Sequence, residues 1–188
     1  LPSPRVRKEG GRFSLEYNRP SSIGRMKSFY GNFSIMVRAY SYIRRMGGAG
    51  LKRAAETAIL NANYIKERLK GTYHLAFDEP CMHEAVFSDK IQLGSGISTM
   101  DVAKRLIDYG YHPPTVYFPL VVHGAIMIEP TETETVDTLD RFIEVMKAIA
   151  EEAKTNPQLL KDAPTKTKIR RVDETRAARE PILRWKKA

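Results

Sequence analysis

Cysteine, long apolar runs and a leader sequence are scarce or missing in this 188-residue chain. The single cysteine, Cys81, excludes an intrachain disulfide framework and a zinc site built from several cysteines, and it suits a reducing compartment. The longest nearly uncharged apolar stretch, residues 118–128, is far shorter than the roughly 20 residues that a transmembrane helix needs. No basic-then-apolar signal peptide opens the chain. These absences predict a cytoplasmic protein that does not span a membrane.

Several motifs of nucleotide binding and catalysis are also missing. No G-x-G-x-x-G segment follows a predicted strand, and neither a Walker A motif nor a G-x-S-x-G nucleophile elbow occurs. The sequence therefore argues against a doubly wound nucleotide-binding fold and shows no self-sufficient catalytic constellation. The first residue is Leu1 rather than methionine, which is typical of a processed chain or of a piece of a longer protein.

The net charge of +9 is distributed unevenly along the chain. Residues 1–53 carry a net charge of +10, residues 54–164 carry −7, and residues 165–188 carry +6. Basic ends of this kind bind nucleic acid in some proteins, and in others they pack on acidic or phosphate-bearing surfaces of their own assembly. No zinc-finger spacing, RNP-like motif or GXXG loop of the KH type is present, so we favour the second interpretation and expect no nucleic-acid partner.

The spacing of apolar residues predicts an α+β domain. Helices are predicted over residues 32–46, 51–70, 99–110 and about 131–155, with the GGAG stretch at 47–50 ending the first of them. Strands are predicted over residues 12–17, 72–77, 83–88, 116–118 and 125–129. This order favours a mostly antiparallel sheet that helices cover on one face.

Local signals predict how the last two helices begin. Ser98 or Thr99 is expected to cap the third helix, and residues 94–96 before it are expected to form a flexible loop. Thr131 and Glu134 have the spacing of a capping box at the start of the last helix. Its buried stripe is predicted to contain Val136, Leu139, Ile143, Met146 and Ala150.

Three histidines are candidates for a catalytic or substrate-orienting role. His83 precedes Glu84 at the start of a predicted strand, and such a pair could act as a general base. Adjacent strand residues point to opposite faces, however, so we favour a structural role for this pair. His112 and His123 lie in predicted loops, where orienting a substrate and bonding within the loop are equal alternatives.

For Cys81 and for the carboxylates within residues 129–134, a structural role is a simpler explanation than a catalytic one. A nucleophilic Cys81 would need a nearby positive charge, but Glu79 and Glu84 favour the neutral thiol. The three carboxylates within residues 129–134 could perform acid–base work, although acidic residues at the positive end of a helix are the simpler interpretation.

Several long stretches carry a family resemblance. They are RPSSIGR at 19–25, YGNFSIMVRAYSYIRRMGGAGLKRAAETAILNANY at 30–64, MHEAVF at 82–87, DVAKRLIDYGYHPPTVYFPLVVHGAIMIEPTETET at 101–135 and RRVDETRAARE at 170–180. Together they resemble the carboxy-terminal portion of the glycine cleavage system P protein, also called decarboxylating glycine dehydrogenase. The resemblance is to subunit 2, the β chain, of its two-subunit form, and it covers nearly the whole chain.

The resemblance implies a pyridoxal-phosphate (PLP) enzyme of fold type I, the aspartate-aminotransferase-like fold. Such an enzyme decarboxylates glycine and passes the aminomethyl group to the lipoyl arm of the H protein. The family binds PLP through a lysine in an N-x-H-K-like segment, which this sequence lacks, so that lysine is expected upstream of Leu1. A carboxy-terminal fragment of this kind is expected to bind no PLP and to be inactive alone.

The resemblance also implies a division of the chain and a set of partners. Residues 1–45 would end the large domain and form the connecting helix, residues 46–155 would be the small domain, and residues 156–188 would be a basic tail. The expected partners are subunit 1 in a heterotetramer, the amino-terminal part of subunit 2, lipoylated H protein and glycine. The cleft-facing, substrate-binding candidates are Arg19, Arg25, Asn32 and His123, and no metal site is expected.

Two alternatives remain at this point. One is a free-standing basic interaction module that binds nucleic acid with a steep dependence on salt. The other is the small domain of a different fold type I PLP enzyme.

Overall fold

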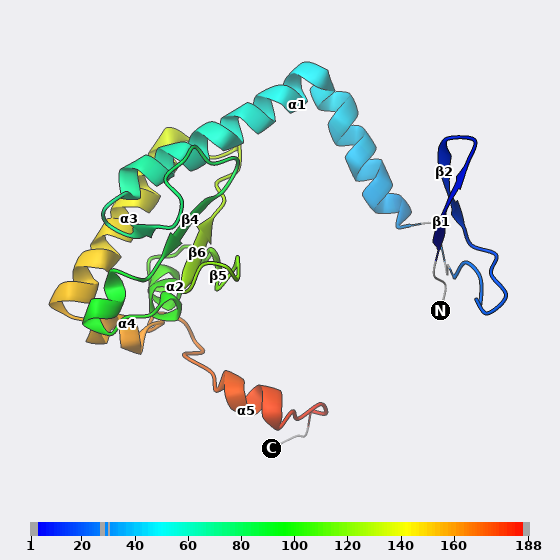
Figure 1. The fold of residues 1–188 in the computed structure, drawn as a ribbon. Coiled ribbons are helices and arrows are strands. Elements are labelled where there is room, and N and C mark those ends of the chain that lie inside the picture. Colours follow the sequence, from blue (N-terminus) through cyan, green and yellow to red (C-terminus); the bar gives the residue numbers. More distant parts are fainter. Residues whose placement is uncertain (1–3, 27–28, 30, 186–188) are drawn as a thin grey trace. The chain divides into compact units, whose positions relative to one another are not determined.

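The computed structural model describes residues 4–26, 29 and 31–185. The chain divides into two compact units, Leu1–Gly48 and Ala49–Ala188. Each unit is a separate body with its own arrangement of strands and helices (Figure 1).

The first unit begins with a two-stranded antiparallel hairpin. Strand β1 (Arg5–Glu9) pairs with β2 (Arg12–Glu16), so the predicted strand at 12–17 is confirmed. Its partner β1 was missed. Gly10 and Gly11 form the turn with φ values of 55° and 79°, a left-handed conformation that glycine adopts without steric cost.

Helix α1 (Phe33–Leu69) consists of two helices that meet at a kink at Gly47, so the predicted end of the first helix at the GGAG stretch is confirmed. The second helix begins at residue 48 rather than at the predicted Leu51. Only Gly47 leaves helical geometry, with φ 61° and ψ −179°, and residues 48–50 are helical again. Glycine adopts these backbone angles without steric cost, so the chain kinks at this residue and returns to helical geometry at the next one.

The second unit contains a four-stranded antiparallel sheet. Its strands, in the order in which they pair, are β3 (His74–Leu75), β4 (Ala85–Ser88), β6 (Ala125–Ile128) and β5 (Thr115–Val116). Its other helices are η1 (Gln92–Ser95), α2 (Thr99–Asp108), α3 (Val136–Thr155), α4 (Gln158–Asp162) and α5 (Glu174–Arg179). The predicted α+β class with a mostly antiparallel sheet is confirmed, although the strands are shorter than expected.

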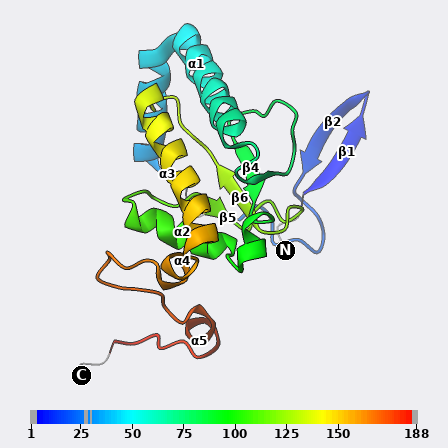
Figure 2. The same ribbon diagram turned by 90° about the vertical axis from the view of Figure 1, so that its left-hand side faces the viewer.

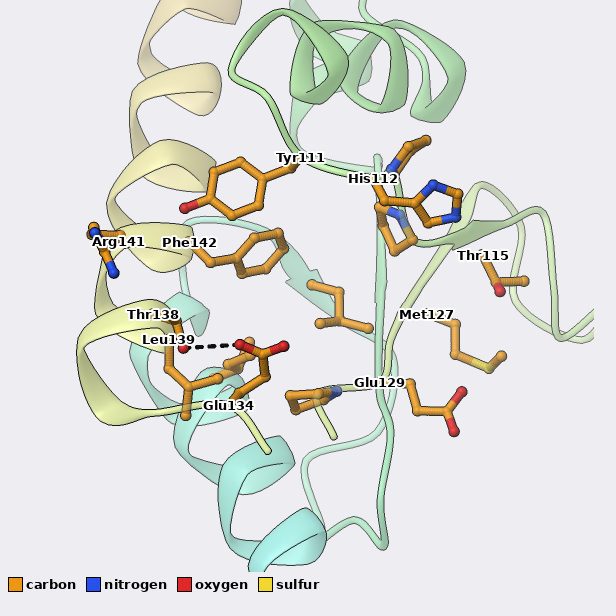
Figure 3. A pocket seen from close by; sticks show the side chains of 15 residues that line it. Tyr111, His112, Thr115, Met127, Glu129, Glu134, Thr138, Leu139, Arg141 and Phe142 are labelled. Carbon is orange, nitrogen blue, oxygen red and sulfur yellow. Dashed lines mark hydrogen bonds between the residues drawn. The ribbon is translucent and has the colours of Figure 1, made fainter. Parts of the chain in front are cut away.

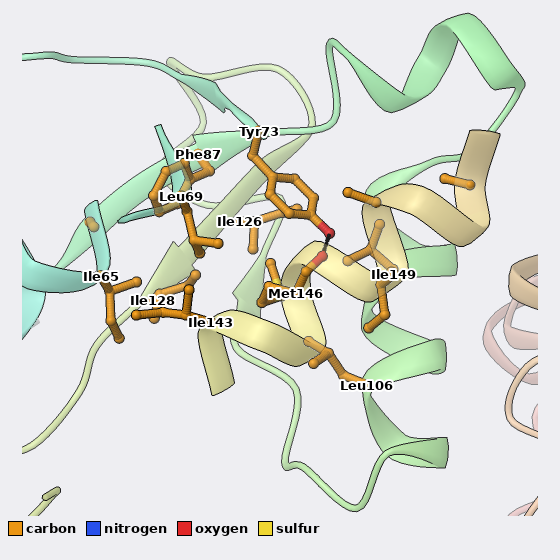
Figure 4. Close-up of a cluster of buried hydrophobic side chains, with 14 of the residues drawn as sticks. Ile65, Leu69, Tyr73, Phe87, Leu106, Ile126, Ile128, Ile143, Met146 and Ile149 are labelled. Carbon is orange, nitrogen blue, oxygen red and sulfur yellow. Dashed lines mark hydrogen bonds between the residues drawn. The ribbon is translucent and has the colours of Figure 1, made fainter. Parts of the chain in front are cut away.

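Helices cover one face of this sheet (Figures 1 and 2). The hydrophobic core lies between that face and the helices (Figure 4). Phe87 on β4 and Ile126 on β6 are register partners, and both side chains are buried on the helix-covered face. The helices contribute Ile65, Leu69, Val102, Leu106, Ile143, Met146 and Ile149. Full burial of one such side chain stabilises the fold by roughly 1.5–3 kcal/mol.

Tyr73 is the one tyrosine in the centre of this cluster. Its ring packs edge-on against Phe87, and its hydroxyl donates a hydrogen bond to the main-chain oxygen of Met146 at 2.9 Å (Figure 4). Burial raises the pKa of the Tyr73 hydroxyl far above its ordinary value. The hydroxyl therefore remains a neutral donor that ties the loop after α1 to helix α3.

Helix α2 begins as its sequence predicts. Ser98 is the N-cap, and its side chain and that of Asp101 exchange hydrogen bonds with each other's backbone N–H in a full capping box. The preceding residues were predicted to be a flexible loop, and this is wrong: Gln92–Ser95 form a 3₁₀ helix. Gly96 ends that helix with φ 71°.

Helix α3 begins later than predicted. Thr135 is its N-cap and accepts a hydrogen bond from the N–H of Thr138, so the capping box of Thr131 and Glu134 is wrong. The backbone of Thr131 and Glu134 instead closes a turn before the helix. Val136 consequently lies in the first helical turn with 62% of its surface exposed, whereas the other four residues of the predicted stripe are buried.

Residues 158–171, which follow α3, are held in the second unit by buried side chains and hydrogen bonds. Leu160 and Ala163 are fully buried, and Arg171 donates to the main-chain oxygens of both. Asp108 accepts hydrogen bonds from the N–H groups of Thr165 and Lys166 at 2.7 and 2.8 Å. These contacts attach residues 158–171 to helix α2.

An ion pair between α2 and α3 supports the same region. The Arg105 guanidinium donates two hydrogen bonds of 2.8 Å to the Glu152 carboxylate, and the Tyr109 hydroxyl donates a third. The pair raises the pKa of Arg105 and lowers that of Glu152, so both stay charged. No helix in the described part of the chain is long and apolar enough to cross a membrane.

Candidate functional site

A cavity of about 630 Å³ lies in the second unit beside the open edge of the sheet (Figure 3). We call it the larger cavity. Three segments form most of its wall: the loop 111–115 after α2, the end of β6 with residues 127–130, and residues 134–142 at the start of α3. Ile65 of α1 completes the wall.

The inner part of the larger cavity is apolar. Tyr111 and Phe142 meet edge-to-face with ring centroids 5.4 Å apart, and Leu139 lies next to them (Figure 3). Pro113 and Pro114 add two rigid residues to the wall. Such a surface suits an apolar or planar group of a ligand.

The polar groups of the larger cavity have mixed charge. Glu129 and Glu134 supply carboxylates, Arg141 supplies a guanidinium, and His112 supplies an imidazole. The Glu134 carboxylate accepts a hydrogen bond of 2.9 Å from the Thr138 hydroxyl, one turn into α3 (Figure 3). The cavity therefore offers acceptors for a cationic or hydrogen-bonding group beside its apolar wall.

The segment between β6 and α3 is held in place by a distant side chain. The Asn61 amide on α1 donates to the main-chain oxygen of Thr131 at 2.9 Å, and Pro130 is buried. Glu129 follows a strand and Glu134 precedes a helix, so the predicted strand-to-helix junction is confirmed. The prediction of a junction did not include a cavity, although both carboxylates line one. The cavity arises because the loop 111–115, which is distant in sequence, lies beside this junction.

His83, Glu84 and Glu129 form a second cluster, which we call the His83 cluster. The Nε2 atom of His83 lies 4.0 Å from a carboxylate oxygen of Glu84 and 3.6 Å from one of Glu129. The expectation that His83 and Glu84 point to opposite faces is wrong. The strand β4 starts only at Ala85, so the alternation of a strand does not apply to these two residues.

The four predicted substrate-binding residues fall in different units. Arg25 lies over the ring of Tyr17 at 4.1 Å, and the side chain of Asn32 accepts from the N–H of Ser34 at the start of α1. The main-chain oxygen of Arg19 accepts from the N–H of Ser22. These three belong to the first unit and His123 to the second, and their role in substrate binding stays a prediction.

His123 lines a smaller cavity of about 340 Å³ near β3 and β4. His74 and Ser88 lie in the same wall, with His74 Nδ1 and Ser88 Oγ 3.1 Å apart. Lys90 also lines this cavity. The two loop histidines of the sequence therefore serve different cavities, since His112 lines the larger one.

Cys81 has the environment of a structural thiol. Burial raises the pKa of the Cys81 thiol, and the nearby Glu84 and Glu67 carboxylates add to this effect, whereas the Lys66 ammonium opposes it. Its backbone N–H donates to the Asn63 side chain at 3.1 Å. The expectation that Cys81 is not catalytic stays a prediction.

The larger cavity lacks the group that would bind PLP covalently. Among the described residues that line it there is no lysine, and the carboxylates of Glu129 and Glu134 outnumber the guanidinium of Arg141, which disfavours a phosphate. The residues present therefore do not fit PLP as a cofactor held by this cavity alone.

Comparison with known proteins gives a consistent result. The family model "Glycine dehydrogenase, C-terminal domain" matches residues 54–168. Over 187 residues the chain is 59% identical to the probable glycine dehydrogenase (decarboxylating) subunit 2 of Caldanaerobacter subterraneus subsp. tengcongensis. It is 54% identical to the proteins of the same name from Listeria welshimeri and Alkaliphilus oremlandii. These matches cover 100% of this chain but 38–39% of each relative, so the chain spans about two fifths of their length.

Proposed function

Because the chain belongs to the family of glycine dehydrogenase C-terminal domains, we propose that it works as the carboxy-terminal part of subunit 2 of a cytoplasmic, decarboxylating glycine dehydrogenase. The whole enzyme decarboxylates glycine and transfers the aminomethyl group to the lipoyl arm of the H protein. Subunit 1 and the rest of subunit 2 are its proposed partners. The high identity to three proteins named subunit 2 supports this proposal.

The proposal assigns PLP to the assembled enzyme rather than to this chain. PLP, when bound, supplies the conjugated ring that accepts electrons during decarboxylation. Its covalent lysine would come from another part of a longer subunit, since no lysine lines the larger cavity in the described residues. The fold type I assignment and the division at 1–45, 46–155 and 156–188 belong to this proposal.

The larger cavity is the part of this chain that we assign to the active-site cleft. The observation that carries the assignment is the position of the lining residues in the sequence: residues 111–115, 127–130 and 134 lie inside 101–135, one of the stretches that carry the family resemblance. Tyr111, Phe142 and the two prolines would exclude water from one side of the reaction. Glu129, Glu134 and Arg141 would orient polar groups of a substrate or partner at the rim.

The first experiment tests the assembly. The chain is expected to co-purify with subunit 1 and the amino-terminal part of subunit 2, and the assembled enzyme is expected to decarboxylate glycine in the presence of H protein. The 188-residue chain alone is expected to show neither activity nor a cofactor absorbance band. Failure to recover either partner, or decarboxylation by the isolated chain, would contradict the proposal.

The second experiment tests the cavity. In the assembled enzyme, Glu134→Gln removes one rim charge and is expected to lower kcat/KM at least tenfold, a loss of about 1.4 kcal/mol of transition-state stabilisation. Glu151→Gln on the exposed side of α3 is the matched control and should stay within twofold. Equal activity of both variants would show that the larger cavity is not part of the active site, and it would not affect the assignment of the chain to its family.

A further inference from the structure

The His83 cluster brings three metal-ligating side chains together on the surface of the second unit. One atom from each of His83, Glu84 and Glu129 lies within 4.8 Å of the other two. The side chains are 57%, 38% and 55% exposed, so the cluster is open to solvent. Glu129 also lines the larger cavity, which places the cluster at the rim of that cavity.

The register of the sheet explains why these residues meet. Strands β4 and β6 are antiparallel, and Ala85 is paired with Ile128 at the end of the ladder. Glu84 precedes Ala85 and Glu129 follows Ile128, and a carboxylate oxygen of each lies within 4.8 Å of the other. Two carboxylates at this separation repel each other.

The structure compensates this repulsion only weakly. Among the ion pairs of the described residues, neither Glu84 nor Glu129 has a lysine or arginine partner, and both are paired with His83 alone. A histidine carries a positive charge only when it is protonated. A bound cation would neutralise both carboxylates and use the neutral imidazole as a third ligand.

We propose that the His83 cluster binds one divalent transition-metal ion of the zinc class. Imidazole together with carboxylate is a ligand set that selects zinc or cobalt over magnesium, which prefers oxygen ligands and water. Ligand atoms around tetrahedral zinc lie about 3.3 Å apart. The observed separations of 3.6 and 4.0 Å close to this value by small rotations of exposed side chains. Water would occupy the remaining coordination position.

This proposal does not depend on the proposed function. It concerns three surface side chains within one unit, and it requires neither the partner subunit nor the cofactor. A failure of metal binding would therefore leave the glycine dehydrogenase assignment intact.

The test uses the tag-free, metal-stripped 188-residue chain, because a polyhistidine tag would itself bind the metal. Cobalt(II) is added while visible absorption is recorded, and zinc binding is measured by calorimetry. We expect one equivalent of each metal to bind with saturation, and magnesium to bind far more weakly. The absence of saturable cobalt and zinc binding would overturn the proposal.

Variants assign the site to these residues. His83→Ala and Glu129→Gln are each expected to weaken zinc binding at least tenfold, because each removes one of three protein ligands. His112→Ala is the matched control, since it removes another histidine at the larger cavity, and it should stay within twofold. Unchanged affinity in His83→Ala, or an equal loss in His112→Ala, would refute the site.

A measurement on the unmodified chain avoids any effect of substitution on folding. The chain has four histidines, whose ring protons can be followed by NMR. Paramagnetic cobalt(II) at one equivalent should shift the ring resonances of His83 most strongly. A larger shift at His74, His112 or His123 would place the metal elsewhere and overturn the proposal.

Discussion

The carboxylate of Asp108 offers the sharpest test of how the second unit is held together. It lies at the end of helix α2 with its side chain fully buried. Its Oδ1 atom accepts from the N–H groups of Thr165 and Lys166, and its Oδ2 atom accepts from the Thr165 hydroxyl at 3.2 Å and from Arg105 at 3.3 Å. One buried charge thus ties the chain after α4 to helix α2.

The number of hydrogen bonds to Asp108 that are lost sets the expected decrease in the free energy of unfolding. A net hydrogen bond to a charged group contributes about 1.5–3 kcal/mol, and two short N–H bonds to Asp108 are lost in Asp108→Ala. The segment at 165–166 can move out into water and recover part of this loss, so we expect a destabilisation of about 3 kcal/mol. Asp108→Asn keeps one acceptor oxygen but loses the charge, and we expect about half that value.

Urea unfolding followed by circular dichroism at pH 7 measures both values. The fluorescence of Trp185 is a poor probe because this residue is 85% exposed. Trypsin should also cleave after Lys166 and Lys168 faster in Asp108→Ala. Glu151→Gln, whose ion pair with Lys154 is exposed, should change stability by less than about 0.5 kcal/mol. A loss below 1 kcal/mol in Asp108→Ala, or unchanged trypsin cleavage, would refute the reasoning.

The same carboxylate predicts a dependence on pH. Burial by itself raises the pKa of Asp108, but the N–H groups of Lys166 and Thr165 and the Arg105 guanidinium together hold it below the ordinary value. A lowered pKa in the folded state stabilises the protein above the unfolded-state pKa of about 3.9, and this stabilisation is lost as the pH falls further. The stability gap between the unsubstituted chain and Asp108→Asn should therefore be constant near neutral pH and shrink below about pH 4.

Three other substitutions have defined expectations. Gly124→Ala should destabilise by roughly 3 kcal/mol in urea unfolding, because its φ of +64° is unfavourable for alanine and the new methyl group would strike the buried carboxylate of Asp89; an effect under 1 kcal/mol would contradict this. Ser98→Ala should cost about 1 kcal/mol by removing the cap of α2, and a neutral result would show that the cap is dispensable. Tyr73→Phe should cost about 1–2 kcal/mol, because the main-chain oxygen of Met146 loses its donor, and stability equal to that of the unsubstituted chain would refute this bond.

The sequence predicted the elements whose signals are local and strong. The cap of α2, predicted at Ser98 or Thr99 and observed at Ser98, and the stripe from Leu139 to Ala150 involve residues that are close in sequence. The beginning of α3 was misplaced because Thr131 and Thr135 both precede a suitable first turn. The choice between them depends on Asn61, which holds the main-chain oxygen of Thr131 from another helix. No local pattern contains that contact.

The strands were found but their lengths were not. The strands β3 and β5 have two residues each, which is too short for an alternating pattern to define their limits. The misplaced start of β4 had a chemical consequence. Assigning His83 and Glu84 to a strand separated their side chains, whereas the observed start at Ala85 allows both to reach Glu129.

The positions of the two cavities depend on which strands pair with each other. The periodicity of apolar residues in the sequence does not determine that pairing. Because β5 pairs with β6 and not with β3, the loop 111–115 lies beside the end of β6 and the start of α3. The pairing of β4 on the other side of β6 brings residues 83–84 to the same end of that strand. Strand β6 is therefore the element that both the larger cavity and the His83 cluster share, and Glu129, the residue that follows it, belongs to both. A change in the register between β4 and β6 would separate the cluster while leaving the contact between β5 and β6 intact, so metal binding and the cavity can be lost independently.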